Sequence, residues 1–165
     1  MKQLSLFFLP IFISCTMYVP DIKTDQDKVV FSAELGGWSE CDTIRSVFVK
    51  TKLHNNSKDT LTYLRMTCSW RDSYTTDNDS FRVTWIPCYS NGPLTTQIPP
   101  GKTEEEYIEV RTKVPLARWR EQHFRVGFNF APLDNTKDVI YNVSRLTDMK
   151  TIMWSDTLKL RSFWK

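Results

Sequence analysis

The chain has 165 residues, a formal net charge of +3 at pH 7 and an aromatic content of 13 %. This length suits one domain with a buried core, and the many aromatic, Val and Thr residues favour strands over helices. Basic and acidic residues are mixed along the chain, without the basic stripe that nucleic-acid binding requires. We therefore expect no nucleic-acid partner.

Residues 1–14 have the features of a secretory signal peptide. Lys2 supplies a positive charge, and the apolar run that follows, residues 4–13, is too short for a membrane-spanning helix of roughly 20 residues. The segment Phe12–Cys15 resembles the lipobox of bacterial lipoproteins. This resemblance implies that Cys15 is lipidated, becomes the first residue of the mature chain and anchors it to a membrane of the cell envelope. An ordinary cleaved signal and a buried N-terminal strand of a cytosolic protein are the alternatives.

The segment after Cys15 divides into a tether and a strand-rich domain. Residues 15–27 are predicted to be a polar tether, and residues 28–165 to form the domain. A first strand is expected at 29–35, ended by the Gly36–Gly37 pair. Further strands are expected where apolar and polar residues alternate, at 46–53, 61–70, 81–85, 104–114, 123–130 and 152–160.

The segments between these strands show turn chemistry or helical spacing. Residues 71–80 are expected to be a polar loop, and 91–102, rich in Pro and Gly, a turn region. Residues 115–122 are predicted to make a helical turn, with Leu116 and Trp119 on one face. Residues 131–150 are expected to be an irregular connection.

The clearest alternation lies in residues 123–130, where Phe124, Val126, Phe128 and Phe130 share one face. Seven to eight short strands with such patterns indicate a β-sandwich. Their order over Val29–Arg161 is similar to that of an immunoglobulin-like domain, and more narrowly to small immunoglobulin-like lipoproteins of Gram-negative envelopes. The expected fold class is therefore all-β: an immunoglobulin-like antiparallel β-sandwich of seven to eight strands.

Three cysteines remain beyond Cys15: Cys41, Cys68 and Cys88. An exported protein occupies a compartment that permits disulfides, and three cysteines allow at most one bridge within a monomer. We predict a Cys68–Cys88 disulfide, because both residues lie at the ends of strand-like runs that could be neighbours. Cys41 is then expected to be a free, buried thiol. The alternative is that all three thiols stay reduced.

No motif for catalysis or metal binding stands out. The histidines His54 and His123 lie outside catalytic motifs, the cysteines lack the close spacing of zinc ligands, and no Gly-rich phosphate loop is present. Residues 77–79 are expected to be a solvated loop rather than a calcium site. Residues 104–106, three glutamates, are expected to be a solvated strand edge rather than an acid–base pair. We expect no enzyme activity, no metal and no cofactor.

Aromatic residues in expected loops are the candidate binding surface: Tyr74, Tyr89 and Trp119. Exposed aromatics can stack on sugars or anchor a protein partner, although the same residues could instead close the ends of the sandwich. The resulting prediction is a lipid-anchored cell-envelope protein that acts by binding or structural assembly, with a protein or glycan partner. A secreted inhibitor or immunity-type protein is one alternative. A carbohydrate-directed enzyme, which would require two converging carboxylates, is the other.

Overall fold

The computed structural model describes residues 28–41, 43–85, 87–149 and 151–164. The expected signal peptide, the lipidation site Cys15 and the tether lie outside these residues. Within them the chain forms eleven strands, one short α-helix and three 3-10 segments. Every strand pair is antiparallel. None of the helices in the described part of the chain has the length and apolar character needed to cross a membrane.

The largest sheet has four strands in the order β1-β2-β7-β5. Its central strand β2 shows the expected alternation, because Val47, Val49 and Leu53 are buried, whereas Lys50 and Lys52 face solvent and form ion pairs. Ile108 and Val110 of β7 are likewise buried, as predicted. The strands of this sheet are β1 (Val29–Cys41), β2 (Ile44–Asn55), β7 (Thr103–Thr112) and β5 (Phe81–Val83).

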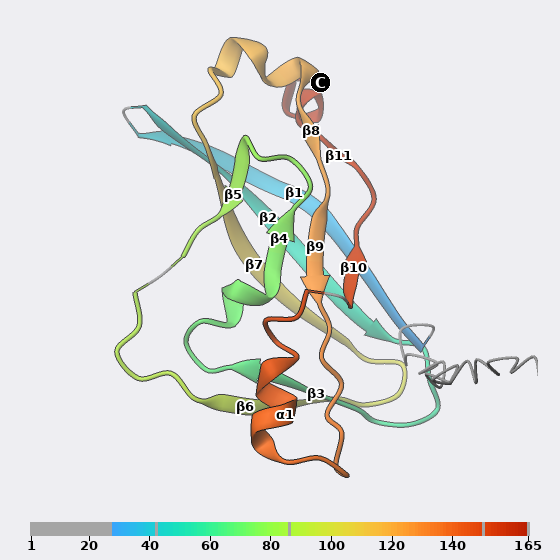
Figure 1. Cartoon of the computed structure of the whole chain (residues 1–165). Helices are drawn as coiled ribbons and strands as arrows, with labels where there is room; N and C mark the ends of the chain where they lie inside the picture. Colours follow the sequence, from blue (N-terminus) through green and yellow to red (C-terminus); the bar gives the residue numbers. More distant parts are fainter. Residues whose placement is uncertain (1–27, 42, 86, 150, 165) are drawn as a thin grey trace, which may run out of the picture.

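The first strand does not end at the Gly36–Gly37 pair, contrary to the sequence prediction. The register against β2 shifts between Leu35 and Gly37, which marks a β-bulge opposite Phe48, and pairing then continues to Cys41. A bulge absorbs one extra residue without ending the ladder, so the turn-like glycines bend the strand instead of stopping it. The β1–β2 hairpin consequently extends to one end of the molecule (Figure 1).

Two smaller sheets pack against the inner face of the long sheet and make the fold a β-sandwich (Figure 1). The main core between the layers joins Val49, Ile108, Phe124 and Val126 with neighbouring apolar side chains. The strands of these sheets are β4 (Tyr74–Thr76), β9 (Val126–Asn129) and β10 (Ile152–Trp154) in one, with β8 (His123–Phe124) and β11 (Leu158–Lys159) in the other.

The strand predicted at residues 123–130 buries the expected face, but it is divided into β8 and β9. Phe124, Val126, Phe128 and Phe130 are all buried. The ladder is interrupted at Arg125, whose backbone N–H and guanidinium both donate to the Asp77 carboxylate, at 2.6 and 2.8 Å. The chain therefore pairs with β11 before this residue and with β10 and β4 after it.

A separate antiparallel pair, β3 (Leu61–Met66) and β6 (Pro93–Ile98), lies at the other end of the sandwich with the helix α1 (Val139–Ser144) close to it (Figure 1). The sequence had indicated only turns at residues 91–102, and this prediction is wrong for β6. Cross-strand pairing with β3 from Leu61↔Ile98 to Met66↔Pro93 outweighs the local turn signals. The expected loop at 71–80 similarly contains β4. Because the strands expected at 123–130 and 152–160 are each divided in two, the described strands number eleven rather than seven to eight.

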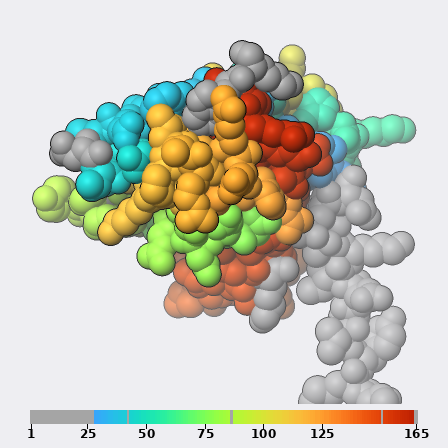
Figure 2. Space-filling model, turned by 90° about the horizontal axis from the view of Figure 1, so that it is seen from above, coloured from blue at the N-terminus to red at the C-terminus, as the bar shows by residue number. Residues whose placement is uncertain are grey.

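The opposite end is closed by two 3-10 segments, η3 (Leu116–Glu121) and η4 (Leu160–Trp164). The helical turn expected at 115–122 is therefore confirmed. Figure 2 shows this end from above, with the residues of η3 in orange beside the C-terminal residues in red. Trp119 of η3 is fully buried, and Leu160 lies beside it in the core.

Candidate functional site

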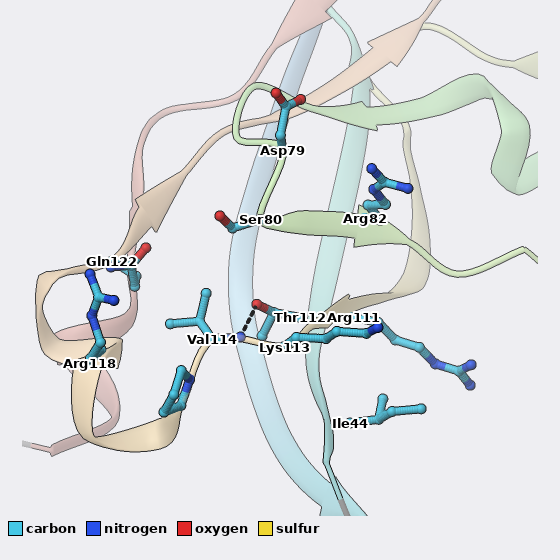
Figure 3. A pocket seen from close by; sticks show the side chains of 11 residues that line it. Ile44, Asp79, Ser80, Arg82, Arg111, Thr112, Lys113, Val114, Arg118 and Gln122 are labelled. Carbon is cyan, nitrogen blue, oxygen red and sulfur yellow. Dashed lines mark hydrogen bonds between the residues drawn. The ribbon is translucent and has the colours of Figure 1, made fainter.

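A pocket of about 650 Å³ opens where β5, the end of β7 and η3 meet (Figure 3). Its lining combines an apolar part with polar and charged groups contributed by several segments of the chain. The lining residues are Ile44, Asp79, Ser80, Arg82, Arg111, Thr112, Lys113, Val114, Pro115, Arg118 and Gln122.

Hydrogen bonds donated by backbone N–H groups hold the two walls of the pocket in place. On one wall, Ser80 N donates to Asn78 Oδ1 at 3.0 Å and Phe81 N to Asn78 O at 2.9 Å, which forms the tight turn into β5. On the other wall, Val114 N donates to Thr112 Oγ1 at 3.0 Å (Figure 3). Arg118 N donates to Pro115 O at 2.9 Å and begins η3. These hydrogen bonds fix the backbone from which the charged side chains of the pocket extend.

The pocket is strongly cationic, because its lining contains four basic residues and a single carboxylate, Asp79. Arg82 lies directly opposite Arg111 in the β5–β7 ladder, and like charges at such positions repel each other. Arg118 approaches from the η3 side, across the opening from the strands (Figure 3). An anion bound between these walls would relieve the repulsion between the paired arginines.

One of the four cations is already engaged beside the pocket. Arg111 Nε lies 2.9 Å from Glu109 Oε1, to which Ser46 Oγ also donates at 2.6 Å. Burial opposes ionisation of Glu109, but the hydrogen bonds from Ser46 and Arg111 outweigh it and lower the pKa of this carboxyl. For the side chains of Arg82, Lys113 and Arg118, no carboxylate partner is found among the described residues.

The chemistry that this lining supports is anion binding. Guanidinium groups recognise carboxylates and phosphates through paired hydrogen bonds, and Ile44, Val114 and Pro115 add apolar contact area. The lining contains no histidine or cysteine. In the described part of the chain, no three His, Cys, Asp or Glu residues come together as a group able to hold a metal ion.

The aromatic residues predicted to form a binding surface are not gathered at one site. Trp119 is fully buried, its Nε1 donates to Val114 O at 3.0 Å and its ring packs edge-on against Trp38 at 5.7 Å, so it cannot serve as a surface aromatic. It closes one end of the sandwich, the alternative that the sequence left open. Tyr89 is fully exposed in the segment before β6, as expected for a loop aromatic.

Tyr74 was expected in a loop but belongs to β4 and faces the core. Its ring lies 4.9 Å from that of Phe128 and 6.4 Å from that of Phe31, and its hydroxyl is 3.3 Å from Thr51 Oγ1. The pairing of β4 with β9 draws this short polar segment into the sheet. The sequence prediction failed because three residues are too few for alternation to be recognised.

The predicted disulfide between Cys68 and Cys88 is confirmed, with a Cα–Cα distance of 5.9 Å. It connects the end of the β3 segment to the loop before β6. Asn91 reinforces this connection, because its Oδ1 accepts from the backbone N–H groups of Cys68 and Ser69, each at 3.2 Å. Cys41 is free, but it is exposed rather than buried, because β1 continues past the glycines and carries this residue to the hairpin tip.

The three glutamates at 104–106 do not form a solvated edge. Glu105 faces outward and pairs with Lys50 at 2.8 Å, whereas Glu104 and Glu106 share the inner face of β7. Arg65 Nη1 lies 3.3 Å from Glu104 Oε1 and 2.8 Å from Glu106 Oε1. The cavity beside them has a volume of about 10 Å³, at the lower limit of what a single water molecule needs. This cluster therefore links two parts of the sandwich and leaves no room for a substrate.

The four cations of the pocket were not recognised in the sequence. Arg82 and Arg111 are 29 positions apart and become neighbours only through the β5–β7 pairing. No local sequence pattern therefore predicts that they line the same pocket. Comparison with known proteins adds no guide to the site, because no protein-family model matches the chain and no curated protein matches it.

Proposed function

We propose that this protein is a non-enzymatic binding protein of the cell envelope, with a lipid anchor at Cys15, an immunoglobulin-like β-sandwich and a distal pocket for anionic groups of a partner. The observation that supports the proposal most directly is the pocket lining, which contains Arg82, Arg111, Lys113 and Arg118 but a single carboxylate, that of Asp79. Such a site attracts acidic groups over a distance and releases them as salt rises.

The position of the pocket supports a role in binding a partner at the end of the domain opposite the proposed anchor. The β1–β2 pairing begins at Val29↔Asn55 and ends at Cys41↔Ile44, and Ile44 lines the pocket. The start of β1, through which the chain connects to Cys15, is therefore at the far end of the sheet from the pocket (Figure 1). Thirteen residues of strand at about 3.3 Å each span roughly 40 Å. A lipid anchor at Cys15 would attach the domain at the end opposite the pocket.

The partner proposed is a protein that presents an acidic segment with an apolar side chain. Its carboxylates would bind the arginines, and its apolar group would contact Ile44, Val114 and Pro115. This combination suits a peptide better than a uniformly charged polymer, because the apolar part of the lining would otherwise face water.

The pocket is tested with a fluorescent oligoglutamate peptide that contains one leucine, titrated against the full chain in detergent micelles. We expect binding that weakens with salt and is lost in the Arg82→Glu, Arg118→Glu double variant. Lys102→Glu is the control for a charge reversal away from the pocket, because this exposed lysine lies in the turn before β7, at the other end of the sheet. Equal binding by all three proteins, or none by the wild type, would contradict the pocket assignment.

The anchor is tested separately by the intact mass of the protein isolated from its native membranes without reduction. We expect a mass that begins at Cys15, carries a lipid adduct and retains the Cys68–Cys88 bridge. A mass that still includes residues 1–14 with all thiols reduced would contradict export and anchoring, and would leave the pocket result standing on its own.

A further inference from the structure

The strand β6 has one unpaired edge. On its inner side it pairs with β3 along its whole length. The other side of β3 is already occupied, because Leu64 N donates to Ala131 O and Leu133 N to Thr62 O, each at 3.0 Å. The small sheet can therefore be extended only beyond β6, which is the last strand in its order.

The hydrogen-bond alternation of an antiparallel ladder determines which backbone groups of β6 point outward. Thr67 N donates to Gly92 O at 2.8 Å, which marks residues 67 and 92 as a hydrogen-bonded pair. Such pairs recur every second residue, so Leu94, Thr96 and Ile98 bond to β3. The N–H and C=O groups of Thr95 and Gln97 then face away from it.

Two further observations agree with this assignment. Pro93, which has no N–H to donate, occupies an outward position, where proline is tolerated on an edge strand. Within the part of the chain that the structure describes, Thr95 and Gln97 have exposed side chains, and no bond from their backbone groups to another segment occurs. This outward row of donors and acceptors, from Pro93 to Ile98, is called the β6 edge below.

The β6 edge lacks one common protection against pairing with another strand, namely charged side chains. Natural edge strands commonly carry lysine or other charged side chains that discourage such contacts. The segment PLTTQI contains no charged residue, and its exposed side chains include Leu94. Only the proline at its start and its short length limit how another strand could add to it.

We propose that the β6 edge pairs with the β6 edge of a second copy of the chain, antiparallel and about a two-fold axis. Two-fold symmetry makes an antiparallel strand contact self-complementary, since each copy presents the same donors and acceptors to the other. Because the edge is uncharged, no like charges become opposed when the two copies meet. The two small sheets thereby join into one four-stranded sheet. A contact of fewer than six residues from each copy is small, so the association is weak and depends on concentration.

The experiment is sedimentation velocity of the full chain in density-matched detergent micelles over a wide range of protein concentration. The wild type is expected to show a monomer–dimer equilibrium. Gln97→Lys places like charges across the two-fold axis and is expected to leave monomer only. Thr62→Lys is the matched control, because Thr62 is the cross-strand partner of Gln97 but lies on β3, away from the edge; this variant is expected to dimerise as the wild type does.

A second variant removes the pairing group itself. Thr95→Pro deletes an outward N–H that makes no bond to β3, so the small sheet keeps its internal bonds while the edge loses a donor. Circular dichroism establishes that each variant is folded. A wild type that remains monomeric at every concentration overturns the proposal. So does a dimer that persists in both edge variants, because its interface then lies elsewhere. The pocket variants Arg82→Glu and Arg118→Glu leave dimerisation unchanged, which separates this proposal from the binding function.

Discussion

The Tyr63 hydroxyl donates a hydrogen bond to Glu104 Oε2 at 2.7 Å and thereby ties β3 to the inner face of β7. Arg65, two residues further along β3, reaches the same glutamate and Glu106. An inward-facing carboxylate is costly unless it is paired and hydrogen-bonded. The two strands therefore hold each other through satisfied polar contacts rather than through apolar packing alone.

Replacing Arg65 with methionine is expected to lower the free energy of unfolding by about 2 kcal/mol, because both glutamates lose their charged partner while staying largely shielded from water. Arg65, Glu104 and Glu106 have side chains that are 25 %, 22 % and 30 % exposed. Urea unfolding followed by tryptophan fluorescence measures the change. Arg82→Met is the control, because this exposed arginine supports no such cluster; an equal loss in both variants would contradict the role assigned to the cluster.

Stability is expected to fall at alkaline pH because of Tyr63 and Tyr74. Burial raises the pKa of both phenols, and for Tyr63 the hydrogen bond to Glu104 raises it further. Unfolded tyrosines lose their protons near pH 10, whereas the folded ones keep theirs. The unfolded state then binds fewer protons than the folded state, so the free energy of unfolding decreases as pH rises above about 10.

The variant Tyr63→Phe is expected to reduce the slope of this alkaline decrease, even if it also lowers stability at neutral pH. Urea midpoints measured from about pH 8 to about pH 11 give the slope. Tyr89→Phe is the control, since this tyrosine is fully exposed. If the slope were the same in the wild type and in Tyr63→Phe, the phenol of Tyr63 would not be the group that resists ionisation.

The sequence predicted those strands in which apolar and polar residues alternate over enough positions to be recognised. Val47 and Val49, Ile108 and Val110, and the phenylalanines of 123–130 are buried as expected, because period-two burial is a local property of a strand that covers a core. The disulfide was also predictable, because only Cys41, Cys68 and Cys88 were available to pair within the domain.

The errors arise where pairing with a distant segment overrides local signals. β6 reads as a turn because it begins with a proline and is flanked by further prolines and glycines, yet its pairing with β3 keeps it extended. Trp119 belongs to a helical turn as predicted, but its burial depends on how η3 folds back onto Trp38 and the core. The pocket depends on the register that places Arg82 opposite Arg111, and register is not encoded in either segment alone.

Removing the disulfide by the double substitution Cys68→Ser, Cys88→Ser is expected to lower the free energy of unfolding by about 3 kcal/mol. The bridge closes a loop with a sequence separation of 20 residues, and its loss returns conformational freedom to the unfolded chain. Urea unfolding without reductant measures the difference. The single variant Cys41→Ser should match the wild type, because Cys41 forms no bridge; no difference between the double variant and the wild type would contradict the prediction.

Gly127 leaves less room for a side chain than the other glycines of the chain. It lies in β9 between β10 and β4, and a Cβ atom there would come within 2.6 Å of Ile152 Cγ2, 2.9 Å of Trp154 Cζ3 and 3.0 Å of Thr75 Cγ2. The nearest of these atoms belong to a branched side chain and an aromatic ring, which have little freedom to move aside. The arginine at 125 also covers the Trp154 ring, with its guanidinium carbon 5.0 Å from the ring centroid.

Gly127→Ala is therefore expected to lower the free energy of unfolding by about 1–3 kcal/mol, because the added methyl group forces strands β10 and β4 apart. Gly37→Ala is the matched control, since no atom lies within 4 Å of a Cβ built at that position. Both variants are compared with the wild type by urea unfolding. If Gly127→Ala were as stable as Gly37→Ala, Ile152 and Trp154 would have to move aside at little cost, and the tight packing of β9 between its neighbours would not be a source of stability.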